Sequence, residues 1–255
     1  DPATPSDLES LLATARFDPP LLARAAALRR ALIAGGVTKY NLAGALPPLD
    51  LPAGRRVLLV PGQVEDDAAM LRGGGAIRRN LDLLRAVRAA EPEAVILFKP
   101  HPDVESGLRP GLVPAAEAAR LADRVLADVP IGPLYAQVDA VHCISSLAGF
   151  EALLRGLPVT TWGQPFYAGW GLTEDRDPPP RRGRVLSLDA LVAAALILYP
   201  RHTDPVTLLP CAPELLVERF ANAAAPAGRA SRLPVSLMAL TARLSRRLAA
   251  WWAAR

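Results

Sequence analysis

The sequence predicts an α/β fold built on a parallel sheet with helices on its faces. Four aliphatic runs follow one another at 55–62, 94–100, 138–144 and 158–163, and a segment with helical periodicity separates each pair of neighbours. Strands that alternate with helices in this way form parallel sheets through helical crossovers. The composition agrees, because 51% of the 255 residues are hydrophobic, which is enough to bury a sizeable core.

Helices are expected before, between and after these strands. Residues 1–45 contain two short helices and an irregular connector, and Ser6 with Glu9 forms a capping box at the start of the first helix. The helices between the strands are expected at 74–92, 114–129 and 147–156, with another at 187–199. The segment 174–184 is rich in proline and charge, so it is expected to be a loop or lid.

The chain divides into three parts on this pattern. A helical segment at 1–50 precedes a doubly wound, Rossmann-like α/β domain at 51–232, and a basic helix covers 233–255. In that last helix an apolar stripe lies beside arginines and consists of Leu237, Leu240, Leu244, Leu248 and Trp251. This pattern is typical of a helix that lies in a membrane interface, and equally of one that packs on its own domain.

Charge and cysteine content exclude several classes of protein. The net charge is only +4, and no dense basic stripe interleaves with aromatic residues, so nucleic acid is not an expected partner. Cys143 and Cys211 are expected to be free thiols in a reducing cytoplasm. No signal peptide is recognised, and no apolar run approaches the ~20 residues of a membrane span. We therefore expect a cytoplasmic protein, with attachment to a membrane surface as an option.

The four strands all end in polar sequence. They run into "GQVEDD", "KPHPDV", "SSLAGFE" and "GQPFYAGWG". Because the carboxyl ends of parallel strands lie along one edge of a sheet, these segments are expected to gather into one pocket. Their composition favours a pocket that accepts an anion.

Ser145 and Ser146 stand between a strand and a helix. Hydroxyls beside the free amides at the start of a helix form a phosphate site. The alternative is that Ser146 is simply the N-cap, which stabilises a helix by roughly 1 kcal/mol. Gly149 favours the phosphate site because it lets a ligand approach the main chain, and Glu151 is placed to bind ribose hydroxyls.

His101 lies between two prolines, which restrict its backbone. Beside Lys99 it suits an anionic leaving group, because the lysine supplies charge and the imidazole a directed hydrogen bond. A histidine satisfied within its own loop is the alternative. His142 lies inside a strand and is expected to belong to the core.

Glu65, Asp66 and Asp67 form a run of three carboxylates at a strand end. Their mutual repulsion favours one that keeps its proton as a general acid, while another acts as an ionised nucleophile. The alternative is a solvated acidic surface. No metal site is expected, because the spacing matches no cation-binding loop.

A glycine-rich segment with aromatic residues follows the fourth strand. Tyr167 and Trp170 are expected to stack on a base or sugar, or to close over the site. Phe166 is interpreted equally well as a core residue.

Together, "PGQVEDDA", "KPHPDV", "SSLAGFEALLRGLPV", "QPFYAGWGLTEDR" and "YPRHTDP" resemble the capsule polysaccharide biosynthesis family. Within it, they look most like the retaining β-Kdo transferases, which build the linker between capsule and lipid. The resemblance covers about residues 10–222, and "FYAGWGLTEDR" is its most specific piece. Leu208 and His202 depart from the pattern, since a glycine and an aromatic residue are expected there.

The resemblance implies a GT-B glycosyltransferase whose donor half is present and whose acceptor half is largely absent. It implies CMP-β-Kdo as donor, a lysophosphatidylglycerol or oligo-Kdo acceptor, and no metal or other cofactor. It also implies that the protein acts together with other capsule-assembly proteins at the cytoplasmic face of the inner membrane. The roles it implies are catalytic for Asp67, Glu65, Asp66 and His101, and donor-binding for Lys99, Pro102, Ser145, Ser146, Gly149, Glu151, Tyr167 and Trp170.

Within the resemblance, Asp67 matches the aspartate that attacks the anomeric carbon, and His101–Pro102 and Ser145–Ser146 lie near the CMP phosphate. Two other functions stay open. One is a GT-B transferase with another donor, such as a CDP-linked polyol phosphate. The other is a non-catalytic nucleotide-binding scaffold.

Overall fold

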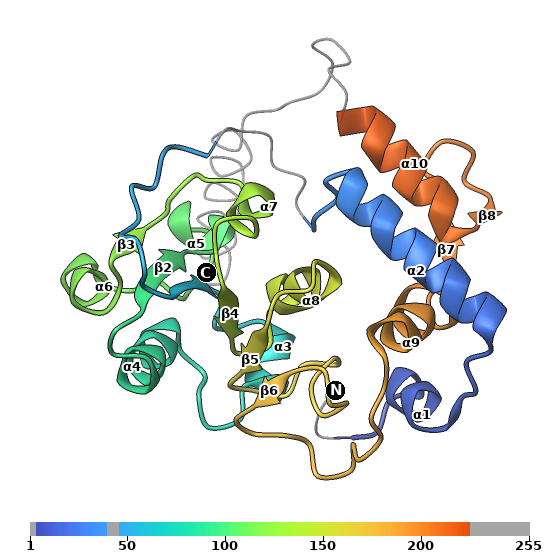
Figure 1. Cartoon of the computed structure of the whole chain (residues 1–255), viewed down its shortest axis with the longest axis horizontal. Coiled ribbons are helices and arrows are strands. Elements are labelled where there is room, and N and C mark those ends of the chain that lie inside the picture. Colours follow the sequence, from blue (N-terminus) through green and yellow to red (C-terminus); the bar gives the residue numbers. More distant parts are fainter. Residues whose placement is uncertain (1–3, 40–45, 225–255) are drawn as a thin grey trace, which may run out of the picture.

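A computed structural model describes residues 4–39 and 46–224 (Figure 1). Its centre is a six-stranded parallel sheet with the strand order β3-β2-β1-β4-β5-β6. The strands of this sheet are β1 (Val57–Pro61), β2 (Val95–Lys99), β3 (Arg124–Val125), β4 (Ala140–Cys143), β5 (Val159–Thr161) and β6 (Glu174–Asp175). The predicted α/β fold with a parallel sheet is therefore confirmed.

Helices cover both faces of this sheet, and a short antiparallel hairpin lies apart from it. The hairpin pairs β7 (His202–Thr203) with β8 (Pro210–Cys211). The helices are α1 (Asp7–Thr14), α2 (Pro19–Ala34), α3 (Ala68–Gly73), α4 (Asn80–Ala90), α5 (Pro102–Glu105), α6 (Ala115–Leu121), α7 (Ile131–Leu134), α8 (Leu147–Leu154), α9 (Leu188–Val192) and α10 (Pro213–Ala224), with a π-helical stretch η1 (Ala193–Leu198) directly after α9.

The sheet separates two apolar cores. Every residue of β1, β2 and β4 is buried, as expected for strands covered on both faces. Successive side chains of β1 alternate between the cores: Leu58 packs with residues of α4 and α6, and Leu59 with residues of α8 and α9. The strand order reverses between β1 and β4, and the loops at this reversal form the usual ligand crevice of such sheets.

The helices of residues 1–50 pack against the last helices of the described chain. Contacts join α2 to α9, η1 and α10, and α1 to η1, and Figure 1 shows this group on one side of the sheet. Ion pairs reinforce the packing, with Arg24 Nε 2.7 Å from Glu214 Oε1 and Arg29 Nε 2.9 Å from Asp189 Oδ1. This helical group also fixes the position of the segment that leaves α2 toward the sheet.

Three local expectations were wrong in part. The helix expected over 114–129 ends at Leu121, and the chain then forms the edge strand β3. The segment 174–184 begins with another edge strand, β6, and is a loop from residue 176 onward, as expected. The helix expected over 74–92 begins only at Asn80. Both missed strands have two residues and pair on one side only, so they carry almost no sequence pattern.

No helix in the described ranges 4–39 and 46–224 combines the length and the apolar character that crossing a membrane would require. The basic helix expected at 233–255 lies outside the described residues.

Candidate active site

The loops that follow β1 and β4 are tied together where the strand order reverses. The buried side chain of Gln63 accepts the N–H of Ser145 at 2.9 Å and donates to Ser145 Oγ at 3.1 Å. Ser145 Oγ donates to the carbonyl of Ala69 at 3.0 Å. Asn80 holds Gln63 from the other side, accepting its N–H at 2.9 Å and donating to its carbonyl at 2.7 Å. The two loops therefore form one continuous wall.

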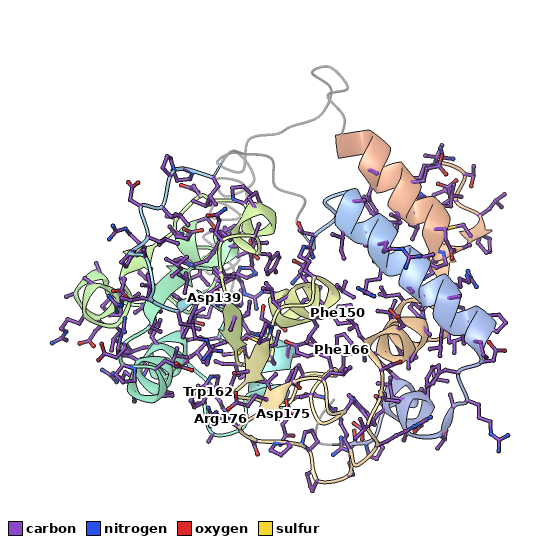
Figure 2. All side chains as sticks on the ribbon, viewed as in Figure 1. Asp139, Phe150, Trp162, Phe166, Asp175 and Arg176 are labelled. Atoms are coloured by element: carbon purple, nitrogen blue, oxygen red, sulfur yellow. The ribbon has the colours of Figure 1, made fainter. Side chains whose placement is uncertain are left out.

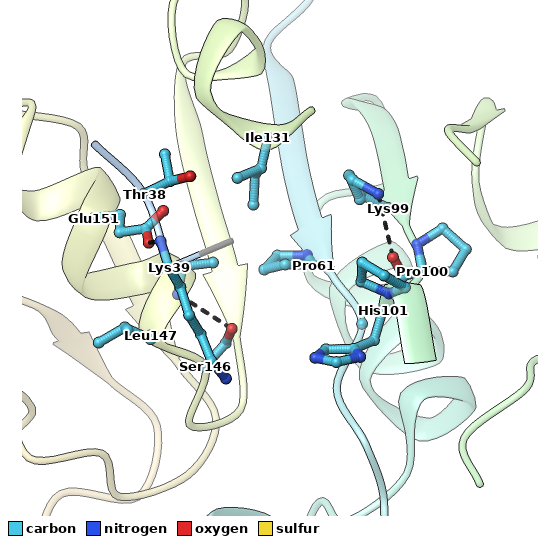
Figure 3. Close-up of a pocket in the computed structure, with 13 residues that line it drawn as sticks. Thr38, Lys39, Pro61, Lys99, Pro100, His101, Ile131, Ser146, Leu147 and Glu151 are labelled. Atoms are coloured by element: carbon cyan, nitrogen blue, oxygen red, sulfur yellow. Dashed lines mark hydrogen bonds between the residues drawn. The ribbon is translucent and has the colours of Figure 1, made fainter. Parts of the chain in front are cut away.

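Two adjoining cavities open beside this wall. Cavity A lies between Glu151, Ser146, His101 and Lys99 (Figure 3). Cavity B is lined by Asp67, His101 and Ser146. The polar strand ends therefore gather at one site, as the sequence predicts.

His101 and Pro102 form the start of α5. His101 is extended, with φ −73° and ψ 136°, and its Nδ1 accepts the N–H of Asp103 at 3.2 Å, while Pro102 takes the first helical position. Burial, the largest cause, lowers the pKa of His101, and Lys39 and Lys99 lower it further, although Asp103 opposes them. His101 is thus neutral at pH 7, with Nδ1 as acceptor and the proton on Nε2.

Lys99 lines cavity A, but its ammonium does not lie beside the His101 ring. It lies 3.4 Å from the carbonyl of Pro100 and 3.8 Å from Glu105 Oε2, and Figure 3 shows it turned toward Pro100. Burial lowers the pKa of Lys99 against the attraction of Glu105, and burial likewise raises the pKa of Glu105. The Lys99 charge, which was expected to act beside His101 on an anionic leaving group, is therefore paired with the half-buried Glu105.

Lys39 faces His101 instead, and strand-end patterns did not identify it. It lines both cavities, and Figure 3 shows its ammonium pointing into the gap between Ser146 and His101. A signal existed in the sequence: Lys39 and Lys99 are the two lysines among 29 basic residues, and both line cavity A. Gln63 and Asn80 were also missed as the side chains that fix the loops.

Ser145 and Ser146 have different partners. Ser146 is the N-cap of α8: its Oγ accepts the N–H of Ala148 at 3.2 Å, so the capping interpretation is confirmed. It also lines both cavities, which keeps the phosphate interpretation open. Ser145 is tied to Gln63 and Ala69, and it lines cavity B.

The three carboxylates at 65–67 point to different places. Glu65 Oε1 accepts the N–H of Asn80 at 2.8 Å, and Asp66 Oδ1 pairs with the exposed Arg109 at 2.6 Å. Asp67 caps α3, with Oδ1 accepting the N–H of Ala69 at 3.0 Å, and among the three it alone lines cavity B. The expected crowding of charge is absent, since each of the three has its own partner.

Glu151 lies at the far end of cavity A. Its Oε1 accepts the main-chain N–H of Lys39 at 2.7 Å, and its Oε2 accepts the hydroxyl of Tyr135 at 3.0 Å. Burial raises the pKa of Glu151, although both hydrogen bonds oppose the shift. The carboxylate therefore fixes the segment before residue 40 beside the cavity, and any ribose would be an additional partner.

Tyr167 and Trp170 belong to the core, so the expectation that they contact the donor is corrected. Tyr167 is 0% exposed and Trp170 1%. The Tyr167 hydroxyl donates to the carbonyl of Ser146, and Trp170 Nε1 donates to the carbonyl of Phe166 at 2.9 Å. Gly149 is likewise a packing residue, because a Cβ there would lie 2.3 Å from the Tyr167 hydroxyl oxygen.

Phe166 is the aromatic residue of this segment that reaches the site. It lines cavity B, and its ring centroid lies 5.1 Å from that of Phe150 on α8 (Figure 2). His142 is 1% exposed in the core, as predicted, and Cys143 and Cys211 are free thiols. Across the described residues, no group of three or more histidines, cysteines or carboxylates is arranged to hold a metal ion.

Comparison with known proteins places this architecture in a family. The family model described as "Capsule polysaccharide biosynthesis protein" matches residues 4–202. The capsule polysaccharide modification protein LipA of Neisseria meningitidis is 47% identical over 207 residues, which is 80% of this chain and 29% of LipA. The chain thus spans less than a third of this curated relative.

Two solved structures share the fold. The KpsC β-Kdo 2,7 transferase of Thermosulfurimonas dismutans is 38% identical with a TM-score of 0.75, over 88% of this chain and 68% of that one. The KpsC β-Kdo 2,4 transferase of the same organism is 29% identical with a TM-score of 0.75, over 87% and 69%. On the family match and these likenesses, the chain belongs to the capsule polysaccharide biosynthesis family and has the fold of its GT-B-like glycosyltransferases.

Proposed function

We propose that this chain binds CMP-Kdo and transfers its sugar, with retention of configuration, to a lipid-linked acceptor. The observation that carries the proposal is that Asp67, His101 and Ser146, from three separate loops, line one cavity. A carboxylate beside groups that suit a phosphate is what a transferase needs to displace a nucleotide through a covalent intermediate. The likeness to two Kdo transferases supports the choice of sugar.

In this proposal, His101 and the start of α8 receive the phosphate of the donor. Neutral His101 offers its Nε2–H, because Nδ1 is already an acceptor for Asp103. The first turn of α8 adds main-chain amides and the positive end of its dipole, with Ser146 at the cap. These groups stabilise the charge that collects on the phosphate as CMP leaves. Cavity A, with Glu151 at its end, would take the nucleoside.

Asp67 is the proposed nucleophile. Among the described residues, the amide of Ala69 bonds to its Oδ1, so we assign the attack to Oδ2. The new bond joins Oδ2 to the anomeric carbon as the bond from that carbon to the phosphate oxygen breaks. An acceptor hydroxyl then attacks the same carbon, passes its proton to solvent water and releases the Asp67 carboxylate. Two inversions give net retention. We propose that neither step uses a metal ion.

A third cavity adjoins cavity B and is the proposed acceptor side. It shares Ala69, Ser145 and Phe166 with cavity B and extends to Arg72 and Gln164. In our proposal the acceptor is a lysophosphatidylglycerol or oligo-Kdo chain, which would place the enzyme at the cytoplasmic face of the inner membrane with other capsule-assembly proteins.

The test compares Asp67→Asn with Asp66→Asn in a Kdo transfer assay. Asp67→Asn keeps an N-cap but removes the nucleophile, so transfer should fall by ~10³-fold or more. Asp66→Asn changes the neighbouring residue, which pairs with Arg109 outside the cavity, and should transfer at the wild-type rate. Equal rates for Asp67→Asn and wild type would reject the mechanism.

Nucleotide preference tests the donor separately. Thermal shifts with CMP, CDP and UDP should be largest for CMP. A preference for CDP would favour the CDP-linked donor, and a preference for UDP would reject both. Binding of CMP without any transfer by the wild-type protein would favour a nucleotide-binding scaffold.

A further inference from the structure

A short strap, residues 35–39, carries Lys39 from α2 to the cavities. Its main chain is held by α8, because Glu151 Oε1 accepts the N–H of Lys39 at 2.7 Å and Arg155 donates to the carbonyl of Val37 at 3.4 Å. Glu151 is itself fixed by the hydroxyl of Tyr135. The strap is therefore held against α8 through its main chain, and Lys39 lines both cavities.

In the proposed mechanism, the carboxylate of the donor sugar and the carboxylate of Asp67 would approach each other in the cavity that Lys39 lines. The Lys39 ammonium points into the gap between Ser146 and His101 (Figure 3). Lys39 also lines cavity B together with Asp67. Among the described residues that line cavity B, Lys39 is the one whose side chain is cationic at neutral pH, since burial keeps His101 neutral. The described lining of cavity B thus contains one ammonium, that of Lys39, and one carboxylate, that of Asp67.

The chemistry of the donor sugar explains why a cation in this cavity would assist the reaction. Kdo is a 2-keto sugar acid, and its carboxylate is attached to the anomeric carbon that Asp67 would attack. A carboxylate nucleophile that approaches this carbon meets a second carboxylate of the same charge. A cation that holds the sugar carboxylate reduces this repulsion and turns the sugar for attack. A neutral sugar has no such group to offer.

We infer that Lys39 binds the carboxylate of the donor sugar and so makes the site selective for acidic 2-keto sugars over neutral ones. This inference rests on the proposed function. His101 and the start of α8 already provide for the phosphate, and Lys39 adds a cationic side chain to the cavity that Asp67 lines.

The experiment compares Lys39→Met, Lys39→Arg and the control Arg30→Met, which removes a charge from the exposed face of α2. CMP has the phosphate but lacks the sugar carboxylate. We therefore measure Kd for CMP by calorimetry and kcat/KM for CMP-Kdo by transfer. Each substitution at Lys39 keeps the main-chain bond to Glu151, and thermal denaturation of each variant checks that the fold is kept.

Lys39→Met should lower kcat/KM for CMP-Kdo by at least 30-fold and leave Kd for CMP within twofold. Lys39→Arg should recover most of the loss, and Arg30→Met should match wild type in both measurements. An equal loss for CMP and CMP-Kdo would overturn the inference by making Lys39 a phosphate ligand, and so would an unchanged kcat/KM. If wild type neither binds CMP nor transfers Kdo, the proposed function itself fails.

Discussion

The two regions with the most distinctive sequence in this chain have different structural roles: one lines the cavities and the other packs in the core. The switch-point loops, residues 62–67, 99–102 and 144–146, turn polar side chains into two cavities. The aromatic segment, residues 164–176, encloses Tyr167 and Trp170 in the core behind them. One contact between the regions is the Tyr167 hydroxyl, which donates to the carbonyl of Ser146. A distinctive motif can therefore reflect a demand of packing as readily as one of chemistry.

The aromatic segment should respond to substitution through stability. Trp170→Ala removes a fully buried ring and its hydrogen bond to Phe166, so the free energy of unfolding should fall by ~3–5 kcal/mol. Chemical denaturation measures this loss, and the protein that remains folded should bind CMP with wild-type affinity. A loss below ~1 kcal/mol would show that the ring is not a core element.

The second largest effect should come from the protonation of buried His142, which lowers the free energy of unfolding. Burial, and then Arg56 and Arg176, lower the pKa of His142 from 6.5 to about 4. Since the folded pKa lies below the unfolded one, the stabilisation is present above pH 6.5 and is lost as the pH falls toward 4. The shift corresponds to ~3 kcal/mol.

Denaturation of wild type and His142→Gln at pH 7 and pH 4 measures this titration. Wild type should lose about 3 kcal/mol more than the variant between the two pH values. Parallel losses would place the acid sensitivity on other groups. The His142 ring on β4 lies 6.4 Å from that of Trp162, and Trp162 and Arg176 lie near the β5–β6 edge (Figure 2). His142 lines neither cavity, so CMP affinity at pH 7 should be the same in both proteins.

The switch-point loops should respond through catalysis. His101→Asn keeps a side chain that can cap α5 but removes the Nε2–H aimed at the donor. Because a hydrogen bond to a charged group contributes ~1.5–3 kcal/mol, kcat/KM for CMP-Kdo should fall ~10–100-fold. The melting temperature should stay near that of wild type. A large loss of stability with unchanged kinetics would make His101 a structural cap alone.

The smallest expected effect is the loss of stability on replacing a serine that caps a helix, and two such serines can be compared. Ser146 caps α8, and Ser187 caps α9, where its Oγ accepts the N–H of Ala190 at 3.2 Å. Each Ser→Ala substitution should cost ~1 kcal/mol of stability. Only Ser146→Ala should also weaken CMP binding, because Ser187 is remote from the cavities. Equal CMP affinities in the two variants would limit Ser146 to capping.

The central strands were predictable because their signals are local. Aliphatic runs such as 55–62 form buried strands wherever helices can cover them, and polar residues at their ends must gather at one edge of a parallel sheet. Of the three adjacent carboxylates, Asp67 was singled out by the family resemblance alone. In the structure it is the one of the three that lines cavity B, and its role as nucleophile stays a prediction.

Other features depend on contacts that no local pattern encodes. Lys39 reaches the site because Glu151, 112 residues further on, binds its main chain. The local sequence around Tyr167 and Trp170 is compatible with closing over a ligand and with filling a core. Only the packing of the surrounding elements determines which of the two they do. The edge strands β3 and β6 are too short to show an alternation of apolar and polar side chains.

The most direct test of the account is to find the covalent intermediate. The full-length enzyme would be mixed with CMP-Kdo without acceptor, then digested and mapped by mass spectrometry. The account predicts one Kdo attached to the peptide that contains Asp67, and none in Asp67→Asn. Kdo found on Glu65, on Asp66 or on a peptide remote from cavity B would contradict it.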